Sequence, residues 1–466
     1  DLNRNDAVVY LANVYQGGGL DGIPRGAVKS LRLFTYHFLY PGMGGPQAVV
    51  GMEGPWDIKR IMGTVPVAED GSAYFRVPAN TPISAQPLDE EGKALQLMRS
   101  WFTAMPGEVL SCAGCHESQN TAPPAKLALA ARRSPAEIKP WYGPSRGFNF
   151  LREVQPVLDK YCAGCHDGSR DSIPNLKERA YITDYTSVFH SGGQDAGHFS
   201  VSYVELHRFV RRPGLESDYH LLTPMEFHAD STDLVQMLEK GHHGVQLDAE
   251  AWDRLITWID LNAPFHGTWH EIAGQERVAS PAQRRRELLK LYANMDQDFE
   301  AIPEIPREPV QTIILPQETR AQAPEPVCPG WPFDAAEARR RQAEAAGTLR
   351  LAADGAEPSA QQTIELGNGV ALELALIPAG SFVMGSSEGY PDETPETAVV
   401  VGEPFWMART EITNAQFESY DPTHDSGVES RFSMQFGVRG FYVNAPGQPV
   451  VRVSWNEAMA FCEWLS

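Results

Sequence analysis

The pentapeptide Cys-Ala-Gly-Cys-His stands twice in the chain, at 112–116 and at 162–166, and uses four of the six cysteines. Two thiols separated by two residues can each form a thioether with one vinyl group of a porphyrin, and the next histidine then lies beneath the ring. The spacing therefore predicts two covalently bound haem c groups. The residues expected to bind them are Cys112, Cys115 and His116 in the first motif and Cys162, Cys165 and His166 in the second, with each histidine as the proximal iron ligand.

A zinc site built from the two Cys-x-x-Cys pairs is the main alternative. Zinc ribbons usually separate such pairs by about 15–20 residues. The interval from Cys115 to Cys162 is much longer, and zinc does not require a histidine directly after each pair. The pattern therefore favours haem.

The ligand on the other side of each iron separates an electron carrier from a haem that can bind a small molecule. For the second haem the candidates are His242 and His243, only one of which can face the iron, with Met225 as the next choice and His228 in the same stretch as Met225. For the first haem no candidate stands out, since His37 alternates with apolar neighbours and is expected in the core. An open first haem with a small-molecule ligand follows as an expectation.

Charge and length limit the remaining choices. The chain has 466 residues, enough for about three domains. Its 39 basic and 60 acidic residues give a net charge of −21, which argues against nucleic acid as a partner. No apolar run approaches the length of a membrane span.

Haem attachment through thioethers takes place outside the bacterial cytoplasmic membrane, so a periplasmic or otherwise exported location is expected. The chain opens at Asp1 and ends within "FCEWLS", inside an expected helix. We expect both ends to be internal to a longer chain, so the lack of a visible signal peptide says nothing. Pairing of Cys328 with Cys462 in an oxidising compartment stays open, and Cys462 is expected to be structural.

Local patterns divide the chain into four parts. Residues 1–125 are expected to be β-rich, with a strand in "AVKSLRLFTYHFLY" and a hairpin in "GTVPVAEDGSAYFRVPA". Residues 147–270 are expected to be helical, with one helix leading into the second motif and another beginning at Asp248. Residues 271–362 form a predicted Pro/Ala-rich linker with one isolated surface helix, and residues 363–466 begin a new domain with strands.

Three sets of segments resemble known families. "GPWDIKRIMGTVPVAEDGSAYFRVPANTPISAQPLDEEGKALQLMRSW" with the "SCAGCHE" that follows resembles the middle domain of hydrazine synthase alpha subunits. "FNFLREVQPVLDKYCAGCHDG" with "WDRLITWIDLNAPFHGTW" resembles the cytochrome c domain that follows it in those proteins. "IPAGSFVMGS", "FWMARTEITNAQF" and "PVVRVSWNEAMAFCEWLS" resemble the start of a formylglycine-generating (sulfatase-modifying factor) domain.

The resemblance implies a multidomain fold. A β-rich domain with the first haem motif is followed by an all-α, class I cytochrome c-like domain and by an incomplete, irregular α+β domain related to C-type lectins. It also implies that calcium is a candidate ligand of the last domain. Hydrazine synthase alpha subunits have a tyrosine ligand just after their first motif. Here no tyrosine occurs between His116 and Tyr142, so ordinary ligation by His116 is expected.

The leading hypothesis is a dihaem c-type cytochrome that exchanges electrons with a redox partner protein and is fused to a sulfatase-modifying-factor-type domain. One alternative is an oxidoreductase that acts on a small nitrogen or oxygen species at an open first haem. The other is a lectin-like binding module on a haem scaffold. The resemblance implies a formylglycine-generating or non-haem iron oxidase activity for the last domain, in a region that these residues do not include.

Overall fold

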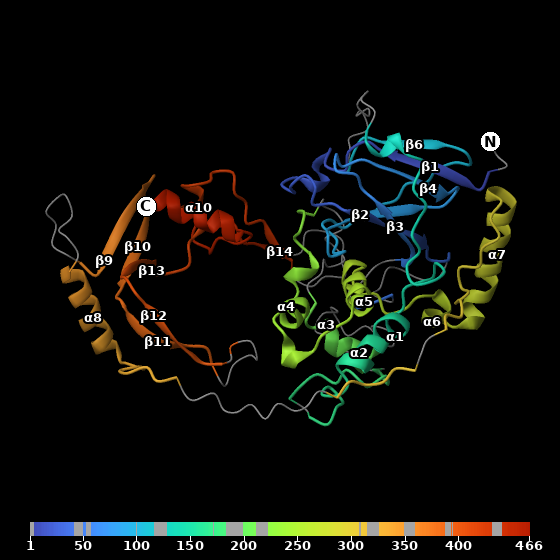
Figure 1. Ribbon diagram of the computed structural model, residues 1–466. Helices are drawn as coiled ribbons and strands as arrows, with labels where there is room; N and C mark the ends of the chain where they lie inside the picture. Colours follow the sequence, from blue (N-terminus) through green and yellow to red (C-terminus); the bar gives the residue numbers. More distant parts are fainter. Residues whose placement is uncertain are drawn as a thin grey trace. The chain divides into compact units, whose positions relative to one another are not determined.

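The computed structural model describes residues 4–41, 50–52, 57–98, 100–115, 128–170, 172–182, 199–210, 222–306, 309–314, 326–348, 359–386, 393, 395–430 and 440–466. The chain forms two compact units, the first built from residues up to Pro316 and the second from residues after it. Figure 1 shows the larger unit in blue to yellow and the smaller one in orange to red. Each unit is described by itself.

Two three-stranded sheets form the β-rich part of the larger unit. The first sheet has the order β4-β1-β6, and the second has the order β3-β2-β5. The strands are β1 (Asp6–Leu11), β2 (Ser30–His37), β3 (Ile58–Pro66), β4 (Ala73–Pro78), β5 (Ile83–Leu88) and β6 (Val109–Cys112). Strands β1 and β6 are parallel, and the other pairs are antiparallel. Apolar residues of both sheets, among them Val9, Leu33 and Phe75, share one buried cluster between them.

The predicted hairpin is wrong in its pairing. The turn forms, with the Ala68 amide donating to the Ser72 carbonyl at 2.8 Å. However, β3 pairs with β2 and β4 pairs with β1, so the two strands lie in different sheets. Val65 of β3 and Phe75 of β4 thereby enter the same core from opposite layers. The strands that pair with β3 and β4 are distant in the sequence, so a local alternation pattern cannot predict which strands they pair with.

The helical part contains α1 (Phe150–Glu153), α2 (Gln155–Tyr161), α3 (Val201–His207), α4 (Asp233–Glu239) and α5 (Ala249–Asp260), with a short strand pair β7 (Tyr181–Ile182) and β8 (Phe199–Ser200). The predicted helix before the second motif is confirmed, although it is divided into α1 and α2 at Val154, just before Pro156. The predicted apolar face is buried. The predicted cap of α5 is also confirmed, because the Asp248 side chain accepts a hydrogen bond from the Ala251 amide.

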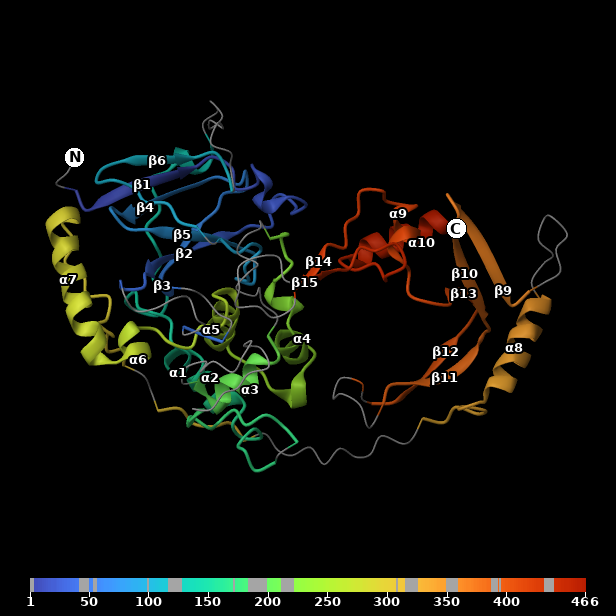
Figure 2. The same cartoon turned by 180° about the vertical axis from the view of Figure 1, so that it is seen from behind.

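The β-rich and helical parts share one core, although the sequence suggested two separate domains. A single buried cluster joins Phe34 and Ile61 of the sheet to Phe150, Trp258 and Phe265 of the helical part. Figure 2 shows the helices directly beneath β2, β3 and β5. Aromatic residues of this size each bury a large apolar area, so the two parts stabilise each other.

The predicted linker is wrong in its first section. Helices α6 (Trp269–Ala273) and α7 (Gln275–Ala293) follow the helical part without a break in structure. Val278 of α7 is fully buried with Tyr40, Ile58 and Trp269. Farther on, the Ile313 amide donates to the Lys160 carbonyl at 2.8 Å. Helix α7 was missed because it contains a proline and many charged residues; its packing relies on buried Val278 and partly buried Ala282.

The smaller unit is α+β. One sheet has the order β13-β10-β9, and β11 pairs with β12 and β14 with β15. The elements are α8 (Ala335–Thr348), β9 (Gln361–Gly367), β10 (Val370–Ile377), β11 (Gly380–Met384), β12 (Thr397–Val401), β13 (Phe405–Ala408), α9 (Asn414–Glu418), β14 (Val428–Ser430), β15 (Gly440–Tyr442) and α10 (Trp455–Leu465). Helix α8 is not isolated as predicted, because Ala346 is buried and Gln342 donates to the Leu376 carbonyl. Both predicted capping boxes, at Thr413 and Ser454, are confirmed.

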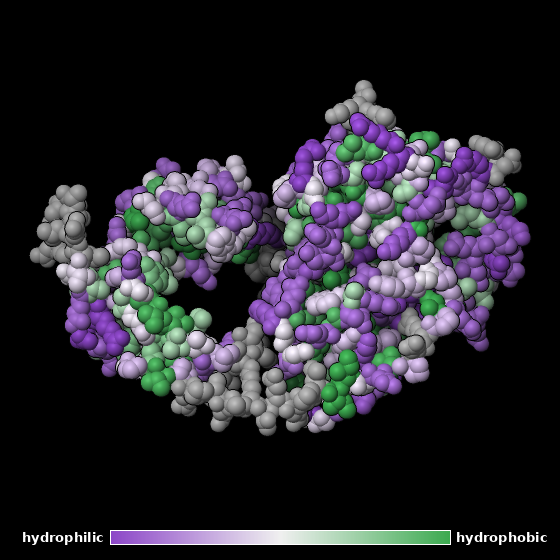
Figure 3. Space-filling model, in the orientation of Figure 1, coloured by the Kyte–Doolittle hydropathy of each residue, from purple (hydrophilic) through white to green (hydrophobic). Residues whose placement is uncertain are grey.

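The surface agrees with the acidic, charged composition. Hydrophilic side chains cover most of the visible face of the larger unit (Figure 3). Among the described helices, none is both long enough and apolar enough to cross a bilayer.

We expect the buried ion pair between Arg32 and Asp260 to hold the sheet on the helices. Its N–O distance is 2.6 Å, and both side chains are at most 1% exposed. Arg32→Met alone should destabilise the larger unit by about 3–5 kcal/mol, because Asp260 keeps a buried charge without its partner. The double variant Arg32→Met/Asp260→Leu should lose less. Urea unfolding measures both, with the exposed Arg208→Ala as control; equal losses in single and double variants would contradict the role.

Candidate functional site

The second motif forms a tight turn at the end of α2. The Cys165 and His166 amides both donate to the Cys162 carbonyl, at 3.0 and 2.9 Å. Cys162 is half-buried, and burial raises the pKa of its thiol to about 12, while Cys165 is exposed. The turn thus presents two thiols and an imidazole from one short segment, as attachment of a porphyrin requires.

His166 is oriented by a backbone carbonyl. Its Nδ1 lies 3.0 Å from the Pro174 oxygen. A carbonyl can only accept, so Nδ1 carries the proton and Nε2 of the neutral ring keeps its lone pair. Burial is the main cause that lowers the pKa of His166 below its usual value. The ring is therefore neutral at pH 7, with Nε2 suited to a metal, and the carbonyl fixes its direction.

His242 faces this ring. The centroids of the His166 and His242 rings are 6.0 Å apart, with planes inclined by 33°. An imidazole nitrogen binds a metal at about 2 Å and the ring centroid lies about 1 Å behind it, so two rings on opposite sides of one iron stand about 6 Å apart. Burial, with His243 and His166 nearby, lowers the pKa of His242 to about 4. The residues of the second motif and His242 thus fit a haem held between two neutral histidines.

The backbone turns sharply around His242 and His243, so the two adjacent side chains are placed differently. Gly241 has φ +87° and His243 has φ +47°, so the backbone bends sharply on both sides of His242. The centroids of the His243 and His242 rings are 4.6 Å apart, and the two rings meet edge to face. Of the two candidates, His242 is the one whose ring lies against His166.

An ion-paired cap holds this turn near the second motif. The Tyr161 hydroxyl donates to the Asp248 carboxylate at 2.7 Å, and the Lys160 ammonium lies 2.9 Å from the same oxygen. These contacts, led by Tyr161, lower the pKa of Asp248 to about 2. Since Tyr161 immediately precedes the motif and Asp248 follows the His242 turn, they fix the two sides of the site relative to each other.

The other predicted ligands of the second haem are placed differently. Met225 is 43% exposed, and its backbone amide donates to the Leu95 carbonyl. His228 is buried, with Nε2 2.9 Å from the Asp89 carboxylate and Nδ1 accepting from the Asp230 amide. Both nitrogens of His228 are thus engaged by the protein. Asp167, next to the second motif, accepts hydrogen bonds from Ser169 and remains a surface residue.

The first motif follows β6. The Ala12 and Asn13 amides donate to the carbonyls of Cys112 and Ala113. A side chain at Gly114 would bring its Cβ within 1.9 Å of the Gln16 oxygen, so this close approach requires glycine. Burial raises the pKa of the Cys115 thiol to about 11. His116 and Glu117 lie outside the described residues.

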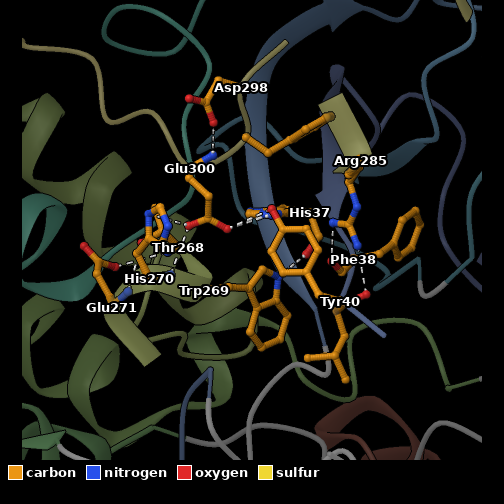
Figure 4. Close-up of polar contacts among 12 residues, drawn as sticks. His37, Phe38, Tyr40, Thr268, Trp269, His270, Glu271, Arg285, Asp298 and Glu300 are labelled. Atoms are coloured by element: carbon orange, nitrogen blue, oxygen red, sulfur yellow. Dashed lines mark hydrogen bonds and ion pairs between the residues drawn. The ribbon is translucent and has the colours of Figure 1, made fainter. Parts of the chain in front are cut away.

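His37 is a core histidine, as expected. It is 1% exposed, and its Nε2 lies 3.0 Å from the Tyr40 hydroxyl and 3.1 Å from the Glu300 carboxylate (Figure 4). Glu300 also accepts hydrogen bonds from the Tyr40 hydroxyl and the His270 amide. Glu300 lies in the predicted linker, and no local sequence pattern indicates this cluster.

The remaining cysteine predictions can be compared directly with the structure. All six cysteines lie in the described residues, and none forms a disulfide, so the pairing of Cys328 with Cys462 does not occur. Cys462 is exposed on α10. In the described part of the chain no three His, Cys, Asp or Glu side chains gather as a metal site.

Comparison with known families agrees with two of the three resemblances. Residues 26–117 match the hydrazine synthase alpha subunit middle domain. Residues 366–466 match the sulfatase-modifying factor enzyme 1-like domain. The first match includes the first Cys-x-x-Cys-His motif, while the helical part with the second motif lies outside both. No curated protein sequence matches the chain.

Two solved structures show more distant similarity. Hydrazine synthase from Kuenenia stuttgartiensis has 18% identity and a TM-score of 0.42, covering 56% of this chain and 43% of that chain. PvdO from Pseudomonas aeruginosa has 25% identity and a TM-score of 0.19, covering 23% of this chain and 44% of that one. This chain thus spans less than half of either protein. Both TM-scores are below 0.5, so the relation to known proteins rests on the two family matches.

Two buried histidines should give opposite pH dependences of stability. Burial is the largest influence on His37 and lowers its folded pKa. At His228 burial also acts to lower the pKa, but the Asp89 hydrogen bond and the charges of Asp230, Asp89 and Asp260 together outweigh it, so the folded pKa is raised. The contribution of His37 is therefore present above about pH 6.5 and is lost as pH falls below it. That of His228 is present below about pH 6.5 and is lost as pH rises through its folded pKa.

The test compares His37→Gln and His228→Gln with the unmodified chain by urea unfolding from pH 5 to pH 8. The stability difference between unmodified chain and variant should shrink at low pH for His37→Gln and grow at low pH for His228→Gln. Slopes of the same sign for both variants would contradict this assignment.

Proposed function

We propose that this chain is an exported dihaem c-type cytochrome that transfers electrons to or from a partner protein, joined to a sulfatase-modifying-factor-type domain. The observation that carries the proposal is the 6.0 Å separation of the His166 and His242 rings beside the Cys162–Cys165 pair. A haem iron supplies one-electron transfer between its oxidation states. Thioether attachment outside the cytoplasmic membrane is the reason for the exported location.

The protein residues around the second motif have distinct roles in this proposal. Cys162 and Cys165 would attach the porphyrin and Nε2 of His166 would bind the iron, while the Pro174 carbonyl holds Nδ1 of His166. His242 would supply a second imidazole ligand, which would keep small molecules from the iron. The Tyr161–Asp248 contact holds these two sides at a fixed distance, so little rearrangement accompanies a change of charge.

A second candidate function is catalysis on a small nitrogen or oxygen species at the first haem. The match of residues 26–117 to the hydrazine synthase alpha subunit middle domain favours it, since this match includes the first motif. The sequence after that motif lacks a tyrosine up to Tyr142, so His116 is the proposed protein ligand and the other side of the iron would be open.

We expect two covalent haems per chain. After expression with a c-type maturation system, the pyridine haemochrome assay on acid–acetone-extracted protein should count two haems per chain. Replacing Cys162 and Cys165 with alanine should reduce the count to one, and replacing Cys112 and Cys115 should do the same. A count of one or none in the unmodified chain would refute the dihaem proposal.

We expect the reduced chain to bind about one carbon monoxide, because His242 closes the second iron and the first stays open. His242→Ala should raise this number toward two. His243→Ala removes the adjacent histidine and is the matched control, so it should leave the number unchanged. If the unmodified chain binds none, the catalytic candidate falls and electron transfer remains; if His243→Ala alone opens a site, the assignment of His242 is wrong.

A further inference from the structure

A groove with no role in the proposed haem sites runs along α7. It lies between this helix and residues 39–41, which follow β2, and has a volume of about 900 Å³. Leu288, Leu289 and Tyr292 supply much of its apolar surface. A concave, mainly apolar site of this size is suited to a small ligand.

Basic residues of α7 border the same groove. Arg277, Arg284 and Arg285 line it. Arg284 and Arg285 follow Arg277 by seven and eight residues, about two helical turns, so all three lie on one side of α7. No Asp or Glu is among the described residues that line it. In a chain with a net charge of −21, this combination of apolar surface and arginines is a local exception. It favours a ligand that is both apolar and negatively charged.

One wall of the groove is fixed by the buried network. Arg285 donates to the Phe38 and Leu39 carbonyls at 2.6 and 2.9 Å, and its guanidinium stands 3.9 Å from the centre of the Tyr40 ring (Figure 4). The Tyr40 hydroxyl is in turn held by Glu300 at 3.1 Å. The wall therefore requires little ordering when a ligand binds, which favours affinity.

The arginines have different roles. The charge of Arg285 is already balanced in part by Glu300 and Asp57. Arg284 is 70% exposed, and its described ion pair is a long contact of 4.0 Å with Glu287. Arg284 thus presents its guanidinium at the rim, where it can form charge-assisted hydrogen bonds with an anionic head group.

We propose that this groove binds a free anionic amphiphile of the fatty-acid class. The apolar chain lies against Leu288, Leu289 and Tyr292, and the carboxylate lies at Arg284, with Arg277 two helical turns away on the same face. A free molecule fits better than a bilayer, because the apolar side chains line a concave groove that can enclose a single chain.

The test is calorimetric titration of the full chain with sodium decanoate below its micellar concentration, compared with uncharged decanamide. Decanoate should bind to one site, and decanamide should bind at least about tenfold more weakly because it lacks the charge. Arg284→Glu should weaken decanoate binding about tenfold or more. The matched control is Arg286→Glu, which makes the same charge change two residues farther along α7, outside the groove, and should alter affinity by less than about twofold.

Leu288→Asn provides an independent test of the apolar surface and should also weaken binding, with circular dichroism confirming that each variant is folded. Equal losses in Arg284→Glu and Arg286→Glu would indicate general electrostatic attraction and overturn the proposal. So would equal affinity for decanoate and decanamide, or no binding. Binding to anionic phospholipid vesicles that exceeds decanoate binding and depends on Arg284 would assign the face to a membrane instead.

Discussion

The buried ion pair between Arg32 of β2 and Asp260 of α5 is the contact on which the arrangement of the larger unit depends. Two charges removed from water cost several kcal/mol each, and their mutual attraction and further hydrogen bonds offset this cost. Here Arg32 also donates to the Gln86 side chain and the Gly92 carbonyl, and Asp260 accepts from the Ala94 amide. These bonds can form together only when the sheet and the helix have this one relative position.

Because the β-rich and helical parts share one core, both Cys-x-x-Cys-His motifs belong to the same compact unit. The first motif follows β6, which pairs with β1, and the second follows α2, which packs in the same core as β2. Gln96 adds a direct polar link, donating both to the Gly19 carbonyl beside Cys115 and to the Leu222 carbonyl of the helical part. Two haem groups attached here would belong to one compact unit, which favours a proposal in which electrons pass between them.

Much of the local structure could be predicted from short sequence patterns. The apolar spacing from Phe150 to Tyr161 indicated the helix before the second motif, and Asp248 was found as the cap of α5. Helix α7 was missed because its pattern is mostly polar and contains Pro281. Its place depends on Val278, which is buried against residues from β3 and α6. Such a contact joins segments more than two hundred residues apart, and local periodicity does not report it.

The sequence by itself determined the chemistry that this chain can offer: two pairs of cysteines, each followed by a histidine, and a family match for the regions 26–117 and 366–466. Covalent attachment depends on spacing along the chain, so a pattern of five residues suffices to predict it. The tertiary structure decided which distant side chain faces His166, how β3 and β4 are divided between sheets, and that a basic groove forms along α7. Each of these depends on burial shared between remote segments, which only the folded chain brings together.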